Sequence, residues 1–266
     1  MVFLSLFRLT VRIYTISFLV FLTMLPAHAF DPQRVTERDN YIIGNTLHVA
    51  LHEAGHMLID QLKLPVLGQE EDAADNFATI ALIDQDTDLG DLALADTAHF
   101  WFMLSDNAEL EDASFFDEHD LDIQRAYRIV CHLVGVDPIA FDYLAKAANL
   151  AAENYDTCGA NFELTADSWF SVLEPNKAPD NHRNTFQINF DKPKSELKEA
   201  YHILKQGGAM EDLITILDNY VMLPNPIQIH ATMCGEENAF YDPETATIVI
   251  CYELVEFYGR IFDLTN

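Results

Sequence analysis

Apolar residues recur at helical spacing through most of the chain, and the run from Tyr41 to Leu64 is the clearest case. One stripe of this run is wholly apolar and consists of Leu47, Leu51, Ala54, Leu58 and Leu62. His48, His52 and His56 lie roughly opposite that stripe, with further apolar residues close by. Because a helix that is apolar almost all round is usually buried, the pattern predicts a long buried helix. Thr36 or Asp39 can cap its start, and the stretch Leu64-Pro65-Val66-Leu67-Gly68 ends it.

The same spacing predicts that the rest of the first two thirds is helical. The expected helices cover residues 70–83, 88–104, 117–134, 138–151 and 164–173. Acidic residues fill the first turn of the helix at 70–83, where the helix dipole favours them. Asp117 is a suitable N-cap for the helix at 117–134.

The final third of the chain changes character. Residues 186–190 alternate like a half-buried strand, and helices are expected at 195–206 and 210–221. Further strand-like runs follow, with a turn at Asp242-Pro243-Glu244, and a last helix closes the chain; these elements are expected at 227–232, 239–241, 245–252 and 253–264. We therefore predict an α+β fold that is mostly helical, with a small, mainly antiparallel sheet supplied by the C-terminal third.

A polar linker at 175–184 is the best candidate for a boundary between two lobes. It separates a helical metal-binding lobe, residues 30–174, from an α+β lobe, residues 185–266, that would supply the sheet and a cleft wall. The alternative is a small α+β lobe that has no relation to the site.

The N-terminus has the layout of a secretory signal. Arg8 and Arg12 precede an apolar stretch from Ile13 to Leu25, and Ala27-His28-Ala29 offers small residues for cleavage. A retained membrane anchor is the alternative, but the apolar stretch is short for a bilayer span. We therefore predict a signal peptide over residues 1–29, a periplasmic or secreted protein, and no stable membrane insertion after cleavage.

Composition limits the partners and the redox state. The formal net charge of −28 repels nucleic acid and anionic membranes, so nucleic acid is not an expected partner. The four cysteines of an exported chain imply disulfides, for which three pairings are possible. Pairing of sequence neighbours, Cys131–Cys158 and Cys234–Cys251, is the simplest.

The long helix carries the sequence His52-Glu53-Ala54-Gly55-His56. Histidines four residues apart project from one face of a helix, so both imidazoles can bind one zinc ion. Glu53 can then reach a water molecule bound to that zinc. The alternative is a histidine pair packed in a core, which does not explain a glutamate at this offset. His48 lies too far along the helix to share the same ion, and we expect it to be structural.

A third zinc ligand is expected from the next helix. Glu71 and Asp75 are four residues apart and share a face, and a carboxylate there can complete a His-His-Glu site. Asp75 can accept the outer N–H of a ligand histidine and fix its tautomer. We favour Glu71 as the ligand, and Glu70 is the alternative. A solvated acidic helix start would explain Glu70 but not Asp75.

These residues resemble a known class of enzyme. The HExxH sequence followed by ExxxD resembles the gluzincin metallopeptidases, such as thermolysin and the CAAX-prenyl endopeptidases. Residues 52–75, 117–131 and 234–254 look like a bacterial metallopeptidase family that is defined as a domain of unknown function. The resemblance implies a zincin-like core with His52, His56 and Glu71 as ligands, Glu53 as the base and Asp75 behind a ligand histidine.

The order of the parts differs from that class. Peptidases of this type usually place a sheet before the active-site helix, but few mature residues precede His52 here. The stretches 238–241 and 247–250 look like the strand pair that precedes HExxH in the CAAX-prenyl endopeptidases. We therefore expect a permuted order, in which residues 227–252 fold back to line the cleft.

The expected activity is zinc-dependent hydrolysis of peptide bonds in a protein or peptide substrate. Glu53 is the expected general base toward a zinc-bound water, and His119 or Tyr241 could help to stabilise the oxyanion. A first-turn histidine without a catalytic role is the alternative for His119. Two other classes of protein remain open: a non-catalytic, zinc-bearing exported binding or assembly protein, and a latent peptidase whose tail blocks its cleft.

Overall fold

The structure is a computed structural model that describes residues 36–107 and 118–265. The predicted signal peptide and the predicted helix start at Asp117 lie outside these residues. Residues Pro32–Asn266 form one compact unit, which contains almost all of both predicted lobes. The division into lobes stays a prediction.

Helices make up most of the unit, as predicted. They are α1 (Glu37–Leu62), α2 (Glu70–Asp84), α3 (Asp88–Asn107), α4 (Asp122–Val136), α5 (Asp142–Ala147), α6 (Tyr155–Leu173), α7 (Lys198–Gly207), α8 (Ala209–Tyr220) and α9 (Tyr252–Thr265). Short 3-10 segments lie at Ala152–Asn154, Glu174–Asn176 and Ser195–Leu197.

Three of the expected helix starts are wrong, and the helix expected at 138–151 is the shorter α5, which begins at Asp142. Helix α4 begins at Asp122 rather than at residue 117, because the side chain of Gln124 accepts the main-chain N–H of Leu121 and ends the preceding loop there. Helix α6 begins at Tyr155, nine residues before the expected start at Leu164. The apolar spacing is weak in that first part, which explains the miss.

The sheet has four strands in the order β1-β2-β4-β3: β1 (Phe186–Phe190), β2 (Ile227–Thr232), β3 (Ala239–Asp242) and β4 (Thr247–Cys251). Strand β1 is parallel to β2 and β2 is parallel to β4, while β3 is antiparallel to β4. The expectation of a mainly antiparallel sheet is therefore wrong, and the sheet is mixed. Helices α7 and α8 form the crossover between β1 and β2, which is the connection that parallel neighbours require.

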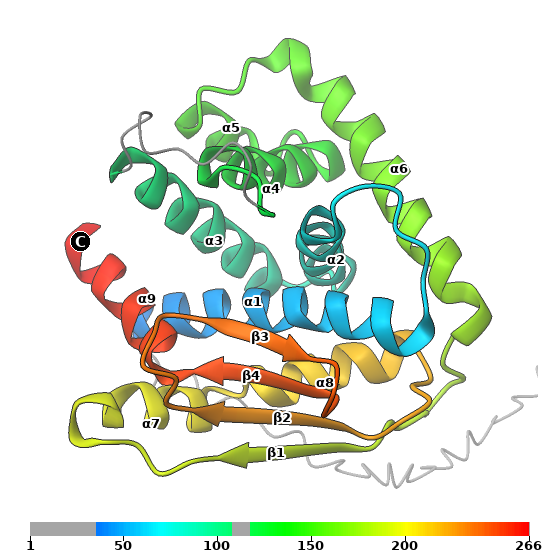
Figure 1. The fold of residues 1–266 in the computed structure, drawn as a ribbon. Coiled ribbons are helices and arrows are strands. Elements are labelled where there is room, and N and C mark those ends of the chain that lie inside the picture. Colours follow the sequence, from blue (N-terminus) through cyan, green and yellow to red (C-terminus); the bar gives the residue numbers. More distant parts are fainter. Residues whose placement is uncertain (1–35, 108–117, 266) are drawn as a thin grey trace, which may run out of the picture. The chain divides into compact units, whose positions relative to one another are not determined.

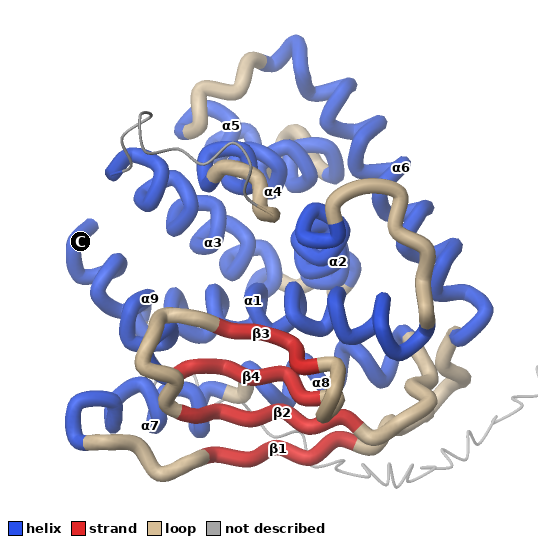
Figure 2. The backbone as a smooth tube through the Cα atoms, in the orientation of Figure 1, coloured by secondary structure: helices blue, strands red, loops and turns tan. Residues whose placement is uncertain are grey.

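Helix α1 is central to the unit. It contacts α2, α3, α7, α8, α9, β3 and β4. Helices α2 and α3 lie on one side of it and the strands on the other, with β3 nearest (Figures 1 and 2). Thr36 caps its start in a capping box with Asp39, as expected. Burial on all sides agrees with the apolar pattern of this helix.

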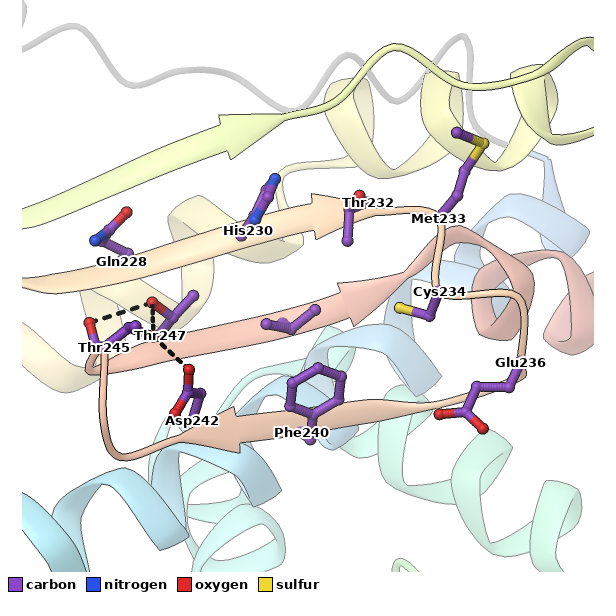
Figure 3. Close-up of a pocket in the computed structure, with 11 residues that line it drawn as sticks. Gln228, His230, Thr232, Met233, Cys234, Glu236, Phe240, Asp242, Thr245 and Thr247 are labelled. Atoms are coloured by element: carbon purple, nitrogen blue, oxygen red, sulfur yellow. Dashed lines mark hydrogen bonds between the residues drawn. The ribbon is translucent and has the colours of Figure 1, made fainter.

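The outer face of the sheet is open within the described residues. Figure 3 shows side chains of β2, β4 and β3 standing on this face, around a groove of about 620 Å³. Phe240 and Asp242 are the residues that β3 contributes to it. Because side chains alternate along a strand, Ala239 and Tyr241 belong to the opposite face of β3, toward α1.

Both disulfides join sequence neighbours, which confirms the simplest pairing. Cys131–Cys158 connects α4 with α6, and Cys234–Cys251 connects the loop after β2 with the end of β4. Among residues 36–107 and 118–265, no helix is long and apolar enough to cross a membrane.

Candidate metal centre

His52 and His56 face each other from successive turns of α1. Their Nε2 atoms lie 3.2 Å apart, and the rings are 4.9 Å apart between centroids. The Glu71 Oε2 atom, from the first turn of α2, lies 3.1 Å from Nε2 of His52 and 3.2 Å from Nε2 of His56. One donor atom from each of the three residues thus lies within 4.8 Å of the others.

The close approach of α1 and α2 depends on small residues. A Cβ on Gly55 would lie 2.8 Å from Cα of Ala74, so only a glycine fits there. Gly55 thus lets α2 approach the site closely. Gly55 and Ala74 therefore set the distance between the histidine face of α1 and the carboxylates of α2.

A carboxylate holds the outer nitrogen of each histidine. His52 Nδ1 lies 2.8 Å from Asp75 Oδ1, and His56 Nδ1 lies 2.9 Å from Glu70 Oε1. A carboxylate accepts hydrogen bonds only, so both Nδ1 atoms carry the proton. Glu70 thus occupies an outer position and Glu71 the inner one, which favours Glu71 over Glu70 as the third metal ligand.

This arrangement fits a metal ion. With both Nδ1 atoms protonated, the two neutral imidazoles direct Nε2 lone pairs toward Glu71 Oε2, which is also a lone-pair donor. Three such atoms repel one another unless a cation lies between them or a ring is protonated. Two imidazoles and a carboxylate form a donor set that is common in metal sites.

The carboxylate behind His52 is itself fixed. Arg125 of α4 donates to both oxygens of Asp75, at 2.7 and 2.6 Å, and its guanidinium lies 3.7 Å from the ring centroid of Trp101. Burial opposes the ionisation of Asp75, but Arg125 and His52 hold its pKa well below the usual range. Asp75 therefore stays ionised and can orient the His52 ring. Arg128 also pairs with carboxylates, including Asp72.

Glu53 lies beside the three donor atoms but is not one of them. Its side chain is buried, and this burial raises the pKa of its carboxyl above the usual value, against the opposing effect of His52 and His56. The main-chain N–H of Tyr241 in β3 faces the same carboxyl and favours its ionised form, lowering its pKa. The edge of the sheet thus lies next to Glu53.

His119 joins the cluster from the loop before α4. Its Nε2 atom lies 2.8 Å from Glu71 Oε2, and its ring lies over that of His52 at 6.0 Å between centroids. The hydrogen bond to Glu71 raises the pKa of His119. Burial opposes the ionisation of Glu71, yet the bonds from His119, His52 and His56 lower its pKa overall.

Two other residues from the sequence lie outside this cluster. The hydroxyl of Tyr241 donates to Asp60 Oδ2 at 2.9 Å and accepts from Gln61 Nε2 at 2.8 Å, near the end of α1. His48 is buried against Thr79, where burial lowers its pKa to about 3, in keeping with a structural role.

Sequence reasoning missed two supporting residues. Glu70 had been considered only as a rival ligand or a solvated residue, whereas it holds His56 from behind. Arg125 is not among the predicted site residues, yet it holds the carboxylate of Asp75 that orients His52. The sequence offers one signal for Arg125: the chain has 15 Lys and Arg residues against 43 Asp and Glu, so a carboxylate partner is expected, but only the fold decides which one.

Comparison with known proteins places this arrangement in context. The family model described as "Putative metallopeptidase" matches residues 20–173 and 190–266 of the chain, which is most of its length. No match was found among curated proteins or among solved structures.

Proposed function

This chain belongs to that metallopeptidase family, and we propose that it is a zinc-dependent enzyme that hydrolyses peptide bonds in protein or peptide substrates. The observation that carries the proposal is the convergence of His52 Nε2, His56 Nε2 and Glu71 Oε2 beside the buried carboxyl of Glu53. A site that is only structural does not require such a base.

The donor set supports zinc as the metal. Two histidine nitrogens and one glutamate oxygen are a usual set of three protein ligands for catalytic zinc, which leaves one position for water or substrate. When bound, zinc supplies Lewis acidity that makes a water molecule more acidic and polarises the carbonyl of the substrate. Asp75 and Glu70 would keep the two histidines neutral and correctly oriented.

Glu53 is the proposed general base. Its buried position raises its pKa toward neutrality, which suits a group that must accept a proton from the attacking water and then release it. The same carboxyl would pass the proton to the amine that leaves. Its place on α1, between the two histidines in sequence, keeps it at a fixed position relative to both.

His119 is the proposed donor to the oxyanion. Its ring is next to His52, and its contact with Glu71 favours the protonated form that can donate a hydrogen bond. Tyr241, the other candidate from the sequence, has its hydroxyl engaged by Asp60 and Gln61. We assign the oxyanion role to His119, because its ring lies over that of His52 in the cluster, whereas the Tyr241 hydroxyl lies near the end of α1.

The edge of β3 is the proposed surface for the substrate main chain. The N–H of Cys251 donates to the carbonyl of Asn238, and pairs alternate along an antiparallel ladder. The main-chain groups of Ala239 and Tyr241 therefore point away from β4, toward the free edge of the sheet. The N–H of Tyr241 faces Glu53, so this edge lies beside the proposed base. An extended peptide could add to it as a further strand.

Export is part of the proposal. The sequence of residues 1–29 has the layout of a signal peptide, and two disulfides suit an oxidising compartment. We propose that the mature protein acts in the periplasm or outside the cell.

The test is metal content and casein cleavage of the mature protein and its Glu53→Gln variant. Zinc should be retained in the variant, and cleavage should fall by at least about 100-fold, the scale of a lost general base. Glu163→Gln changes an exposed glutamate of α6 and serves as the matched control. Two results would favour a non-catalytic binding protein: a wild type that binds zinc but does not cleave casein, or a Glu53→Gln variant that cleaves casein as fast as the Glu163→Gln control.

A further inference from the structure

Tyr241 contacts helix α1 at two separate points. Its main-chain N–H faces the carboxyl of Glu53, and its hydroxyl is bonded to Asp60 and Gln61. Glu53 and Asp60 are seven residues apart, which places them on the same face of α1, two turns from each other. One residue of the edge strand therefore spans the part of α1 that includes His56.

The hydroxyl belongs to a connected set of polar contacts. Asp60 Oδ2 accepts from Tyr241 at 2.9 Å and from Gln61 Nε2 at 3.0 Å, while Asp60 Oδ1 pairs with Lys63 at 2.9 Å. Gln61 Oε1 in turn accepts from Asn225, in the segment that leads into β2, at 2.8 Å. We call Asp60, Gln61, Tyr241 and Asn225 the α1–sheet clamp.

The clamp has chemistry suited to fixing a position. Tyr241 donates to an ionised carboxylate, because Lys63 above all, together with Tyr241 and Gln61, holds the pKa of Asp60 below its usual value. Hydrogen bonds to charged groups are stronger than neutral ones. Among the strands that the structure describes, β4 is the one hydrogen-bonded neighbour of β3. Its position toward α1 therefore depends on side-chain contacts such as this one.

From this geometry we propose that Tyr241 is a positioning residue for substrate binding. Its hydroxyl, held by Asp60 and Gln61, fixes the position of the free edge of β3 along α1 relative to Glu53. A peptide that adds to this edge then presents its scissile bond to the base. This role rests on the proposed peptidase function. It differs from a direct part in catalysis, because Tyr241 would act through the strand that carries it.

The two roles predict different kinetics. If Tyr241 positions the strand, Tyr241→Phe should raise KM for a long casein-derived fluorogenic peptide by about tenfold, the scale of one charge-assisted hydrogen bond. A short peptide that covers little of β3 should be affected much less, and kcat should change little for either. If the hydroxyl instead contacts the oxyanion, kcat should fall by about 10² to 10³ on both peptides.

A double-mutant cycle with Asp60→Asn adds a second criterion. Substitutions of residues in one set of contacts are not additive. The Tyr241→Phe/Asp60→Asn double variant should therefore raise KM for the long peptide no more than the more affected single variant does. Tyr220→Phe is the matched control, since it removes a hydroxyl that also donates to a carboxylate, that of Asp84, at 2.7 Å. It should leave both peptides unaffected.

Hydrogen exchange of the full zinc-loaded protein tests the clamp without any use of activity. The β3 amides should exchange faster in Tyr241→Phe than in the wild type, and no faster in Tyr220→Phe. Unchanged exchange in Tyr241→Phe, additive effects in the cycle, or equal loss of kcat on both peptides would each overturn the proposal. If Glu53→Gln keeps full activity while the exchange result holds, the peptidase assignment fails and the clamp remains as a contact between helix and sheet.

Discussion

Replacing Gly55 by alanine should weaken metal binding while the protein still folds. The new Cβ would lie 2.8 Å from Cα of Ala74 and 3.1 Å from its Cβ, where ordinary contact begins at 3.4 Å. The main chain of α2 must therefore retreat from α1 by about 0.6 Å. Glu71 lies one turn before Ala74 on α2, so Glu71 would move away with this helix, while His52 and His56 keep their positions on α1.

The size of this movement decides which property suffers. Metal–ligand distances tolerate changes of about 0.2 Å, so a shift of about 0.6 Å should weaken metal binding, by roughly 10- to 100-fold if it resembles loss of a supporting contact. Stability should change less. Overpacking costs about 1–3 kcal/mol, but alanine in place of glycine inside a helix returns about 1 kcal/mol.

The assay is competition for zinc against a chromogenic chelator, beside thermal unfolding of the zinc-free protein. Gly159→Ala is the control, because the new Cβ, on α6, would meet only the carbonyl oxygen of Gly135 in α4, at 3.5 Å, which is an ordinary van der Waals contact. This variant should bind zinc like the wild type. A folded Gly55→Ala protein with wild-type zinc affinity would refute the inference that α1 and α2 set the ligand geometry.

Three further predictions test the ligand set, the charge balance and the disulfides. Glu71→Gln should lower zinc affinity far more than Glu70→Gln, for which about 10- to 100-fold is expected because Glu70 only supports His56; equal losses in a chelator competition would contradict this assignment. Burial raises the pKa of Asp96 to about 6, so its charge opposes folding in full above about pH 6, and the cost vanishes only below about pH 3, where the carboxyl is protonated in folded and unfolded chains alike. Asp96→Asn should thus stabilise the protein near pH 8 by roughly 1–2 kcal/mol, allowing for partial exposure, and leave the urea midpoint near pH 3 unchanged. Replacing Cys131 and Cys158 by serine should cost about 3 kcal/mol of unfolding free energy, and an unchanged urea midpoint would argue against it.

The parts of the site that could be predicted are those fixed by short-range geometry. Spacing of four residues puts His52 and His56 on one helix face, whatever the rest of the chain does. The loop between α1 and α2 is short, so α2 must pack beside α1, and this places Glu71 and Asp75 near the two histidines. The capping box at Thr36 is equally local.

Features that depend on distant partners could not be predicted in the same way. Strands β2 (residues 227–232) and β4 (residues 247–251) pair in parallel, because the chain runs back through β3 before it enters β4. Strand β3 then pairs with the other edge of β4 and not with β2. The alternation of side chains along a strand does not show which strands become neighbours. The tyrosine at 241 was singled out, but the direction of its hydroxyl depends on α1 and β3 coming together. Arg125 and Asp75 are 50 residues apart in sequence, and their pairing likewise depends on how α4 packs against α2.

The position of β3 shows what the site requires of the chain. The strand follows α1 in sequence by well over a hundred residues, yet it lies against α1 with its free edge beside Glu53. The disulfide Cys234–Cys251 closes the segment that contains β3 and β4, and the clamp ties the inner face of β3 to the last turns of α1. A strand that precedes its helix closely is held there by a short connection. Here side-chain contacts must do that work, and this is why we expect the loss of one hydroxyl at Tyr241 to be felt in substrate binding.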